Sequence, residues 1–62
     1  MRDPERIDRF MKEVGALWKE NVPDWRFGQL IVNLVRFTGR DPFFWEEDDF
    51  LNKLRDYFST LQ

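Results

Sequence analysis

The chain contains neither cysteine nor histidine, and this absence constrains its fold more than any other feature of the sequence. Domains of this size commonly gain stability from disulfide bonds or a structural metal, which these two residue types supply. With 62 residues there is material for one hydrophobic core, so we expect a single domain over residues 1–62. Aromatic residues make up 18% of the chain, and their packed rings must supply much of its stability.

The first of three segments with helical spacing of apolar residues follows Asp3 and Pro4. Aspartate is a capping residue, and proline is favoured at the first helical position. Apolar side chains at positions 7, 10, 11, 14, 17 and 18 then occupy an arc of about 120°. We predict a helix over about residues 4–20, ended by Asn21 in a left-handed conformation and by Pro23.

The second segment repeats this pattern, with Asp24 as the expected cap and Gly39 where a helix-ending glycine belongs. It predicts a helix over about residues 25–38. Apolar residues occupy most of its circumference, and its polar residues cluster within about 80°. A helix of this kind needs more than one neighbour, so we expect it at the centre of the domain.

The third segment opens with Asp41 and Pro42, which predict a short helical turn near residues 42–45. Four acidic residues at 46–49 precede a last helix over about residues 48–61, where they favour the positive end of the helix dipole. The fold class is therefore all-α, a compact bundle of three main helices in an antiparallel or orthogonal arrangement. The longest uninterrupted apolar run has three residues, far short of the roughly 20 that cross a membrane.

Catalytic chemistry has few candidates in this sequence. Without histidine or cysteine, no nucleophile has an obvious oriented base, and we expect no enzyme, no catalytic residue and no cofactor. The acidic run Glu46–Asp49, with Asp41 nearby, is contiguous, whereas a calcium-binding loop alternates its ligands. We interpret these acids as helix-capping charges and expect no metal site; weak binding of a divalent cation is the alternative.

Charge is distributed unevenly along the chain. The last helix, which a helix-turn-helix protein would place in the major groove, is the most acidic segment, so DNA binding is not expected. The middle segment is mildly basic. Arg26, Arg36 and Arg40 are candidates for binding an anion or RNA, and the alternative is that they form the solvated face of a mostly buried helix.

The aromatic residues outnumber the positions that three short helices easily bury. The apolar stripes assign Phe10, Trp18, Phe27, Phe50, Tyr57 and Phe58 to the core. The remaining rings indicate an interface with a protein partner or with a second copy in a homodimer, because exposed aromatic clusters usually mark binding surfaces. The alternative is that residues 43–45 fold back as a lid over one end of the bundle. The candidate interface residues are Trp25, Arg26, Gln29, Arg40, Phe43, Phe44 and Trp45.

Three motifs carry a resemblance to known sequences: D-P-E-R-I near the start, R-F-G-Q-L-I-V-N in the middle and D-P-F-F-W-E-E-D-D towards the end. Together they resemble a group of short bacterial and phage-associated proteins without an assigned activity. The chain departs from that pattern at Phe27, where an aliphatic residue is usual, and at Phe44, where tyrosine is usual. The resemblance implies a small helical protein inside a bacterial cell. The charged N-terminus and the missing cysteines likewise favour the cytoplasm.

Overall fold

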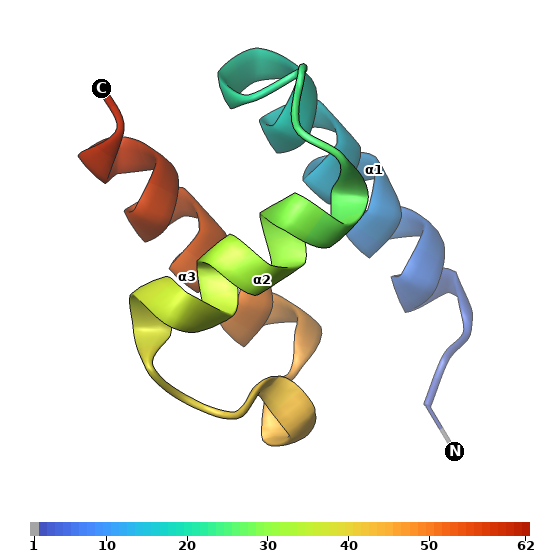
Figure 1. Cartoon of the computed structure of the whole chain (residues 1–62). Coiled ribbons are helices and arrows are strands. Elements are labelled where there is room, and N and C mark those ends of the chain that lie inside the picture. The colour runs from blue at the N-terminus through green and yellow to red at the C-terminus, as the bar shows by residue number, and fades with distance from the viewer. Residues whose placement is uncertain (1) are drawn as a thin grey trace.

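The computed structural model describes residues 2–62, in which all regular elements are helices and no strand occurs. Helix α1 spans Glu5–Asn21, α2 spans Phe27–Thr38, the 3₁₀ turn η1 spans Pro42–Phe44, and α3 spans Glu47–Thr60. In Figure 1, α1 and α3 run in the same general direction, and α2 returns obliquely across them. The prediction of an all-α bundle of three main helices with a short turn before the last is confirmed.

The pairing of α1 with α3 has a constant register. Three polar contacts join these helices near their beginnings, middles and ends, and the partners are 41 or 42 residues apart in every case. Such a constant offset means that the two helices lie side by side in parallel. The pairs, in order, are Arg6 with Glu47, Glu13 with Arg55, and Asn21 with Gln62.

The core is small and mostly aliphatic. Leu30, Leu34 and Leu54 have no exposed surface, so they form its centre where α2 crosses α3. Half-buried rings pack around this centre, among them Trp18 and Tyr57. The complete set of buried residues is Val14, Val22, Leu30, Leu34, Leu51, Leu54 and Phe58.

The central position belongs to α3 rather than to α2, so this expectation was wrong. The backbone of α3 lies against both α1 and α2. Only Leu30 and Leu34 of α2 are buried, while Val32 and Phe37 remain about half exposed. The physical reason is that α2 crosses its neighbours obliquely, so that one side of its broad apolar surface meets them and the other faces solvent.

The start of α2 differs from the expectation by two residues. The helix begins at Phe27, and the backbone N–H of Arg26 donates to the Gln29 side chain at 2.8 Å. The expected cap at Asp24 is wrong, because Arg26 occupies the N-cap position and Asp24 lies two residues before it.

The end of α1 also differs from the expectation. Asn21 is not left-handed, since Gly39 is the residue with positive φ among those described. Its side chain instead donates to the Leu17 carbonyl at 2.8 Å, and the helix ends at Val22, whose N–H donates to the Trp18 carbonyl. The predicted role of Gly39 is confirmed: φ is 66°, and its N–H donates to the Val35 carbonyl at 2.9 Å.

None of the helices in residues 2–62 combines the length and the apolar character needed to cross a bilayer.

The buried leucines generate a first prediction. Replacing Leu54 with alanine should destabilise the domain by about 2–5 kcal/mol, because it leaves a cavity at the centre of the core. Val32→Ala on α2 is the matched control, since its side chain is half exposed and its loss should cost under about 1 kcal/mol. Urea denaturation followed by circular dichroism measures both, and equal losses would contradict the described core.

Candidate aromatic interface

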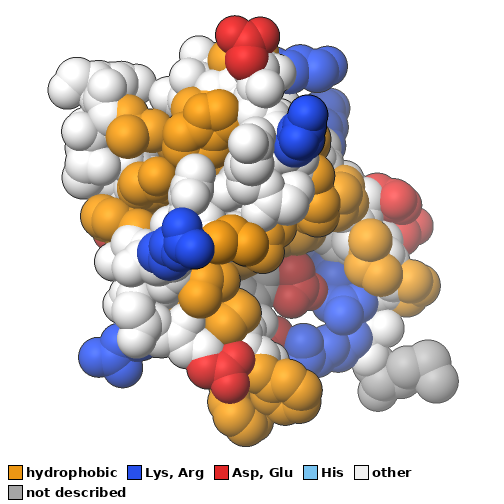
Figure 2. Space-filling view, viewed as in Figure 1, with side chains coloured by type: hydrophobic (Ala, Val, Ile, Leu, Met, Phe, Trp, Pro, Cys, Tyr) orange, Lys and Arg blue, Asp and Glu red, His pale blue; other side chains and the backbone are white. Residues whose placement is uncertain are grey.

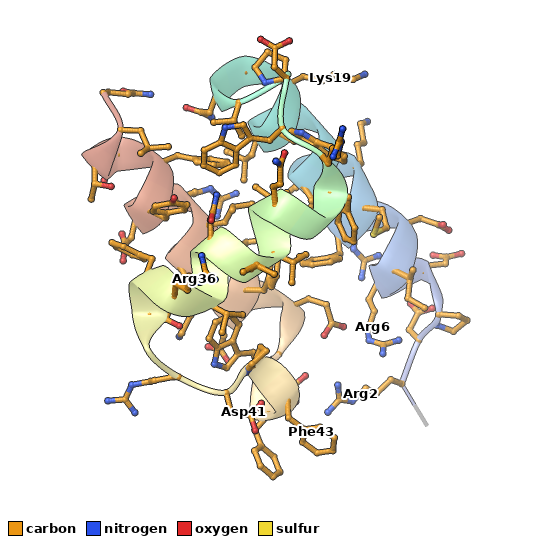
Figure 3. All side chains as sticks on the ribbon, viewed as in Figure 1. Arg2, Arg6, Lys19, Arg36, Asp41 and Phe43 are labelled. Carbon is orange, nitrogen blue, oxygen red and sulfur yellow. The ribbon has the colours of Figure 1, made fainter. Side chains whose placement is uncertain are left out.

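The segment Asp41–Trp45, hereafter the aromatic turn, contains the two most exposed large apolar side chains of the described chain. Phe43 is 79% exposed and Phe44 is 83% exposed. Figure 2 shows hydrophobic side chains projecting at the lower end of the molecule, and Figure 3 labels Phe43 at that end. The two rings contact each other edge to face, with centroids 4.8 Å apart. They form one apolar knob and not two isolated residues.

The backbone of the aromatic turn is held by its own sequence. The Asp41 side chain accepts a hydrogen bond from the Phe43 N–H at 3.0 Å, and Pro42 occupies the first position of η1. The Trp45 N–H closes the turn by donating to the Pro42 carbonyl at 3.0 Å. Proline fixes φ, and the aspartate satisfies a free N–H, so the turn is set locally before any partner binds.

Trp45 differs from its two neighbours because its own chain partly covers it. Its ring is half-buried against the core and lies 6.2 Å from that of Phe50. The Lys53 ammonium lies 5.0 Å above it, within the range of a cation–π contact. The three residues at 43–45 therefore differ in burial: Trp45 packs against the bundle, as the lid alternative predicts, while Phe43 and Phe44 are exposed to solvent. The interface hypothesis loses Trp45 as its anchor and keeps the other two rings.

The candidate residues at the start of α2 lie apart from the aromatic turn. Trp25 is half-buried near Tyr57, and its carbonyl accepts from the Trp18 indole N–H at 3.0 Å. Gln29 is exposed but its side chain is engaged by the Arg26 N–H. This group lies at the start of α2, and the turn follows the other end of this helix, which has 12 residues and is about 18 Å long. The structure therefore does not gather all seven candidates on one surface.

Of the other candidates, Arg40 precedes the aromatic turn directly and is exposed beside it. Arg26, Arg36 and Arg40 are all exposed, and none forms an ion pair within residues 2–62. Figure 3 shows Arg36 on the face of α2, away from the turn. These arginines are spread from one end of α2 to beyond the other, so they do not converge on a common anion site.

The acidic run at the start of α3 is occupied by contacts inside the chain. Arg6 Nε lies 2.5 Å from a Glu47 carboxylate oxygen as a partly buried ion pair without hydrogen-bond alignment. Two guanidinium nitrogens of Arg2 donate to Glu46 at 2.6 Å each. Glu46 raises the pKa of Arg2 through these hydrogen bonds and then through its charge. The Asp49 carboxylate caps the helix by accepting from the Glu46 N–H at 3.1 Å.

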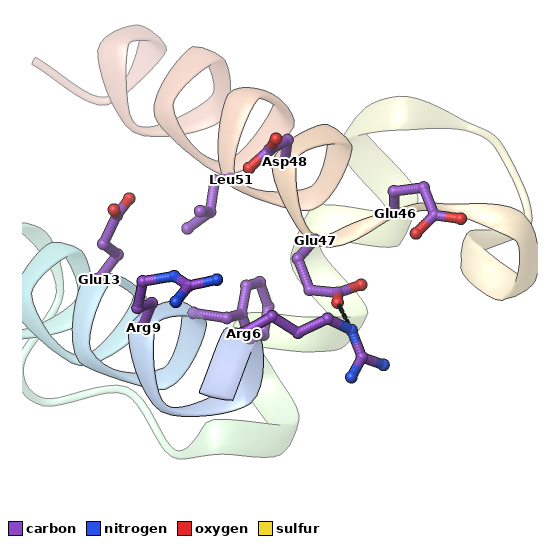
Figure 4. Close-up of a pocket in the computed structure, with 8 residues that line it drawn as sticks. Arg6, Arg9, Glu13, Glu46, Glu47, Asp48 and Leu51 are labelled. Atoms are coloured by element: carbon purple, nitrogen blue, oxygen red, sulfur yellow. Dashed lines mark ion pairs between the residues drawn. The ribbon is translucent and has the colours of Figure 1, made fainter. Parts of the chain in front are cut away.

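A pocket of about 320 Å³ lies between α1 and the start of α3 (Figure 4). Arg6 and Arg9 face it from α1, and Glu47 and Asp48 face it from α3. Opposite charges line the same space, and Glu47 is already paired. The pocket is the polar part of the contact between α1 and α3. Because its lining carries both signs of charge, it does not favour an anionic or a cationic ligand.

The expectation that Phe27 belongs to the core is wrong, and two further residues of the apolar arcs are also exposed. Phe27 is 49% exposed, although its ring lies 5.8 Å from that of Trp18. Ile7 and Met11 on α1 are also about half exposed. Their positions on the apolar arc are correct, but the arc is wider than the surface that α3 covers. Sequence periodicity indicates the face of the helix on which a side chain lies, but it does not indicate how much of that face a neighbouring helix covers.

Comparisons of the chain with protein-family models, with curated proteins and with solved structures found no match. The resemblance to short bacterial and phage-associated proteins stays a prediction.

The division of the aromatic turn predicts two different effects on stability. The free energy of unfolding of the double variant Phe43→Ser/Phe44→Ser should lie within about 0.5 kcal/mol of the wild-type value, because both rings are already exposed to water. Trp45→Ala should cost about 2 kcal/mol, because it removes packing against Phe50 and the core. Thermal and urea unfolding measure both. A large loss from the double variant would mean that the two phenylalanines support the fold.

Proposed function

We propose that the protein is a non-enzymatic protein-interaction module whose docking element is the aromatic turn. The observation that carries this proposal is the exposure of Phe43 and Phe44, 79% and 83%, as one contacting pair. Single exposed apolar residues are normal on protein surfaces, but an aromatic cluster is typical of binding sites.

The conformation of the turn supports the proposal. Pro42 restricts the backbone, Asp41 caps it, and Trp45 ties its end to the bundle. A partner would therefore order little of this segment on binding. Preorganisation of this kind favours affinity because less conformational entropy is lost.

The apolar area of the pair is large enough to contribute to binding. Two phenylalanine side chains at this exposure offer about 300 Å². Burying a phenylalanine fully is worth about 1.5–3 kcal/mol before the costs of association. The partner needs an apolar pocket that accepts two rings at right angles, and Arg40 is placed to contact its rim.

Anion or RNA binding through Arg26, Arg36 and Arg40 is the weaker candidate. The three guanidinium groups are exposed and spread along α2, so they would act separately on a phosphate chain. No second observation favours this function. A cytoplasmic location in a bacterial cell is the setting that the sequence favours for the interaction, and it stays a prediction.

Site-specific photo-crosslinking in cells of the source organism tests the proposal. The photoreactive residue p-benzoylphenylalanine replaces Phe44, where it keeps an aromatic ring in the exposed position. We expect irradiation to yield a discrete covalent adduct with another protein, identified by mass spectrometry. Phe43→Ser in the same chain should reduce the adduct at least tenfold, because it removes half of the knob.

The matched control places the same photoreactive residue at position 32, where Val32 is about half exposed on α2. This position should give no discrete adduct. Equal labelling from positions 32 and 44, or no adduct from position 44, would contradict the proposed docking element.

A further inference from the structure

A shallow groove follows one side of α1. Pro42 and Trp45 of the aromatic turn line its first hollow, whereas Phe43 and Phe44 do not line it. Three adjoining hollows, of about 330, 540 and 360 Å³, share their lining residues in sequence. Ile7 and Met11 line the first, Met11 and Gly15 the second, and Gly15 with Lys19 and Pro23 the third. We call this surface the α1 groove. It contains the part of the apolar arc of α1 that α3 leaves uncovered, and Lys12, Lys19 and Glu20 also line its middle hollow.

Gly15 is the feature of the groove that the monomer does not explain. It lies in the middle of a 17-residue helix, where glycine is less favourable than alanine. Its φ is not positive, and a Cβ added there would meet nothing within 4 Å. Neither the backbone conformation nor a close neighbour inside the chain requires glycine at this position. An outside group packed against α1 would require it.

The chain itself carries a side chain that fits this gap. Met11 lies one helical turn before Gly15, lines the same hollow and is 52% exposed. If a second copy of α1 lies antiparallel across the first, with the two-fold axis level with Glu13, Met11 of each copy faces Gly15 of the other. Methionine is flexible and fills irregular gaps well. A two-fold contact of this kind is self-complementary, as symmetric dimers require.

One pair of exposed charges on this side of α1 fits the same arrangement. Asp8 and Lys19 are exposed, and they lie within about 20° of each other on the helical wheel. Along the helix axis, Asp8 lies before Glu13 and Lys19 lies after it, at nearly equal distances. In the antiparallel pair, Asp8 of each copy lies beside Lys19 of the other, so two opposite-charge contacts form. Such rim contacts fix register and orientation more than they add affinity.

The surface area of the isolated chain leaves room for such a contact. The chain exposes 4962 Å², whereas a folded monomer of its mass is expected to expose about 4,300 Å². The difference between these areas, about 660 Å², is somewhat below the roughly 800 Å² that one partner contributes to a standard interface.

We infer that the protein forms a two-fold homodimer in which antiparallel copies of α1 pack along the α1 groove, with Met11 seated over Gly15 of the partner subunit. This contact uses residues other than Phe43 and Phe44. The inference can therefore be tested independently of the proposed function.

Sedimentation equilibrium of the full chain from micromolar to millimolar concentration tests the inference. The wild type should approach twice the 7.7 kDa mass of one chain. Gly15→Leu fills the gap, and we expect it to weaken the dimer at least tenfold while raising the melting temperature of the dilute monomer by several degrees. The opposite signs separate a lost contact from a lost fold. A monomeric wild type at millimolar concentration would overturn the inference.

Two matched controls complete the experiment. Gly28→Leu makes the same substitution on α2, where a Cβ also meets nothing within 4 Å, and the dimer should be unchanged. Asp8→Lys and Lys19→Asp should each weaken the dimer, and their combination should restore it. If Gly15→Leu and Gly28→Leu weakened the dimer equally, the inference would be refuted. Loss of the dimer in Phe43→Ser/Phe44→Ser would also refute it, because the contact would then lie on the aromatic turn.

Discussion

The structure depends on three leucines that have no exposed surface. Leu30 and Leu34 of α2 meet Leu54 of α3 at the centre of the core. In a chain without disulfide bonds or metal ligands of the thiolate or imidazole type, this packed contact is what holds α2 to the rest of the bundle. The ion pairs between α1 and α3 are exposed or partly exposed, so they set register and add little stability.

A core built around aliphatic side chains explains the distribution of the rings. Phe58 is the one aromatic residue among the fully buried set, and rings such as Trp18, Trp45 and Tyr57 pack around its edge. Phe43 and Phe44 have no place in it, because the turn that carries them projects beyond the end of the bundle. The aromatic surplus of the sequence therefore becomes an exposed knob, and the protein-interaction proposal rests on that outcome.

The parts of the fold that could be predicted from the sequence are those governed by local chemistry. Apolar spacing located the helices to within about two residues. Gly39 adopts the left-handed conformation and Asp41 caps the turn at Pro42, as their types indicate. The expected cap at Asp24 was wrong because α2 begins two residues later than the apolar spacing indicates, which makes Arg26 the N-cap residue. The position of α3 between its neighbours and the pairing of Arg6 with Glu47 depend on contacts 41 residues apart, which no local pattern encodes.

The candidate site shows the same limit. The sequence identified Phe43 and Phe44 as rings in excess of the core, but it grouped them with Trp25 and Gln29 at the far end of α2. Exposure of a residue depends on what covers it. Phe27 and Met11, on correct apolar arcs, remain half exposed because the neighbouring helices cover only part of those arcs.

Nuclear magnetic resonance of the dilute protein with a soluble paramagnetic relaxation agent tests the central claim most directly, because the agent relaxes protons according to their exposure to solvent. The ring protons of Phe43 and Phe44 should relax most strongly, those of Trp45 less, and those of Phe58 least. Phe43 and Phe44 rings as protected as the Phe58 ring would contradict the account, because the chain would then bury its aromatic surplus by itself.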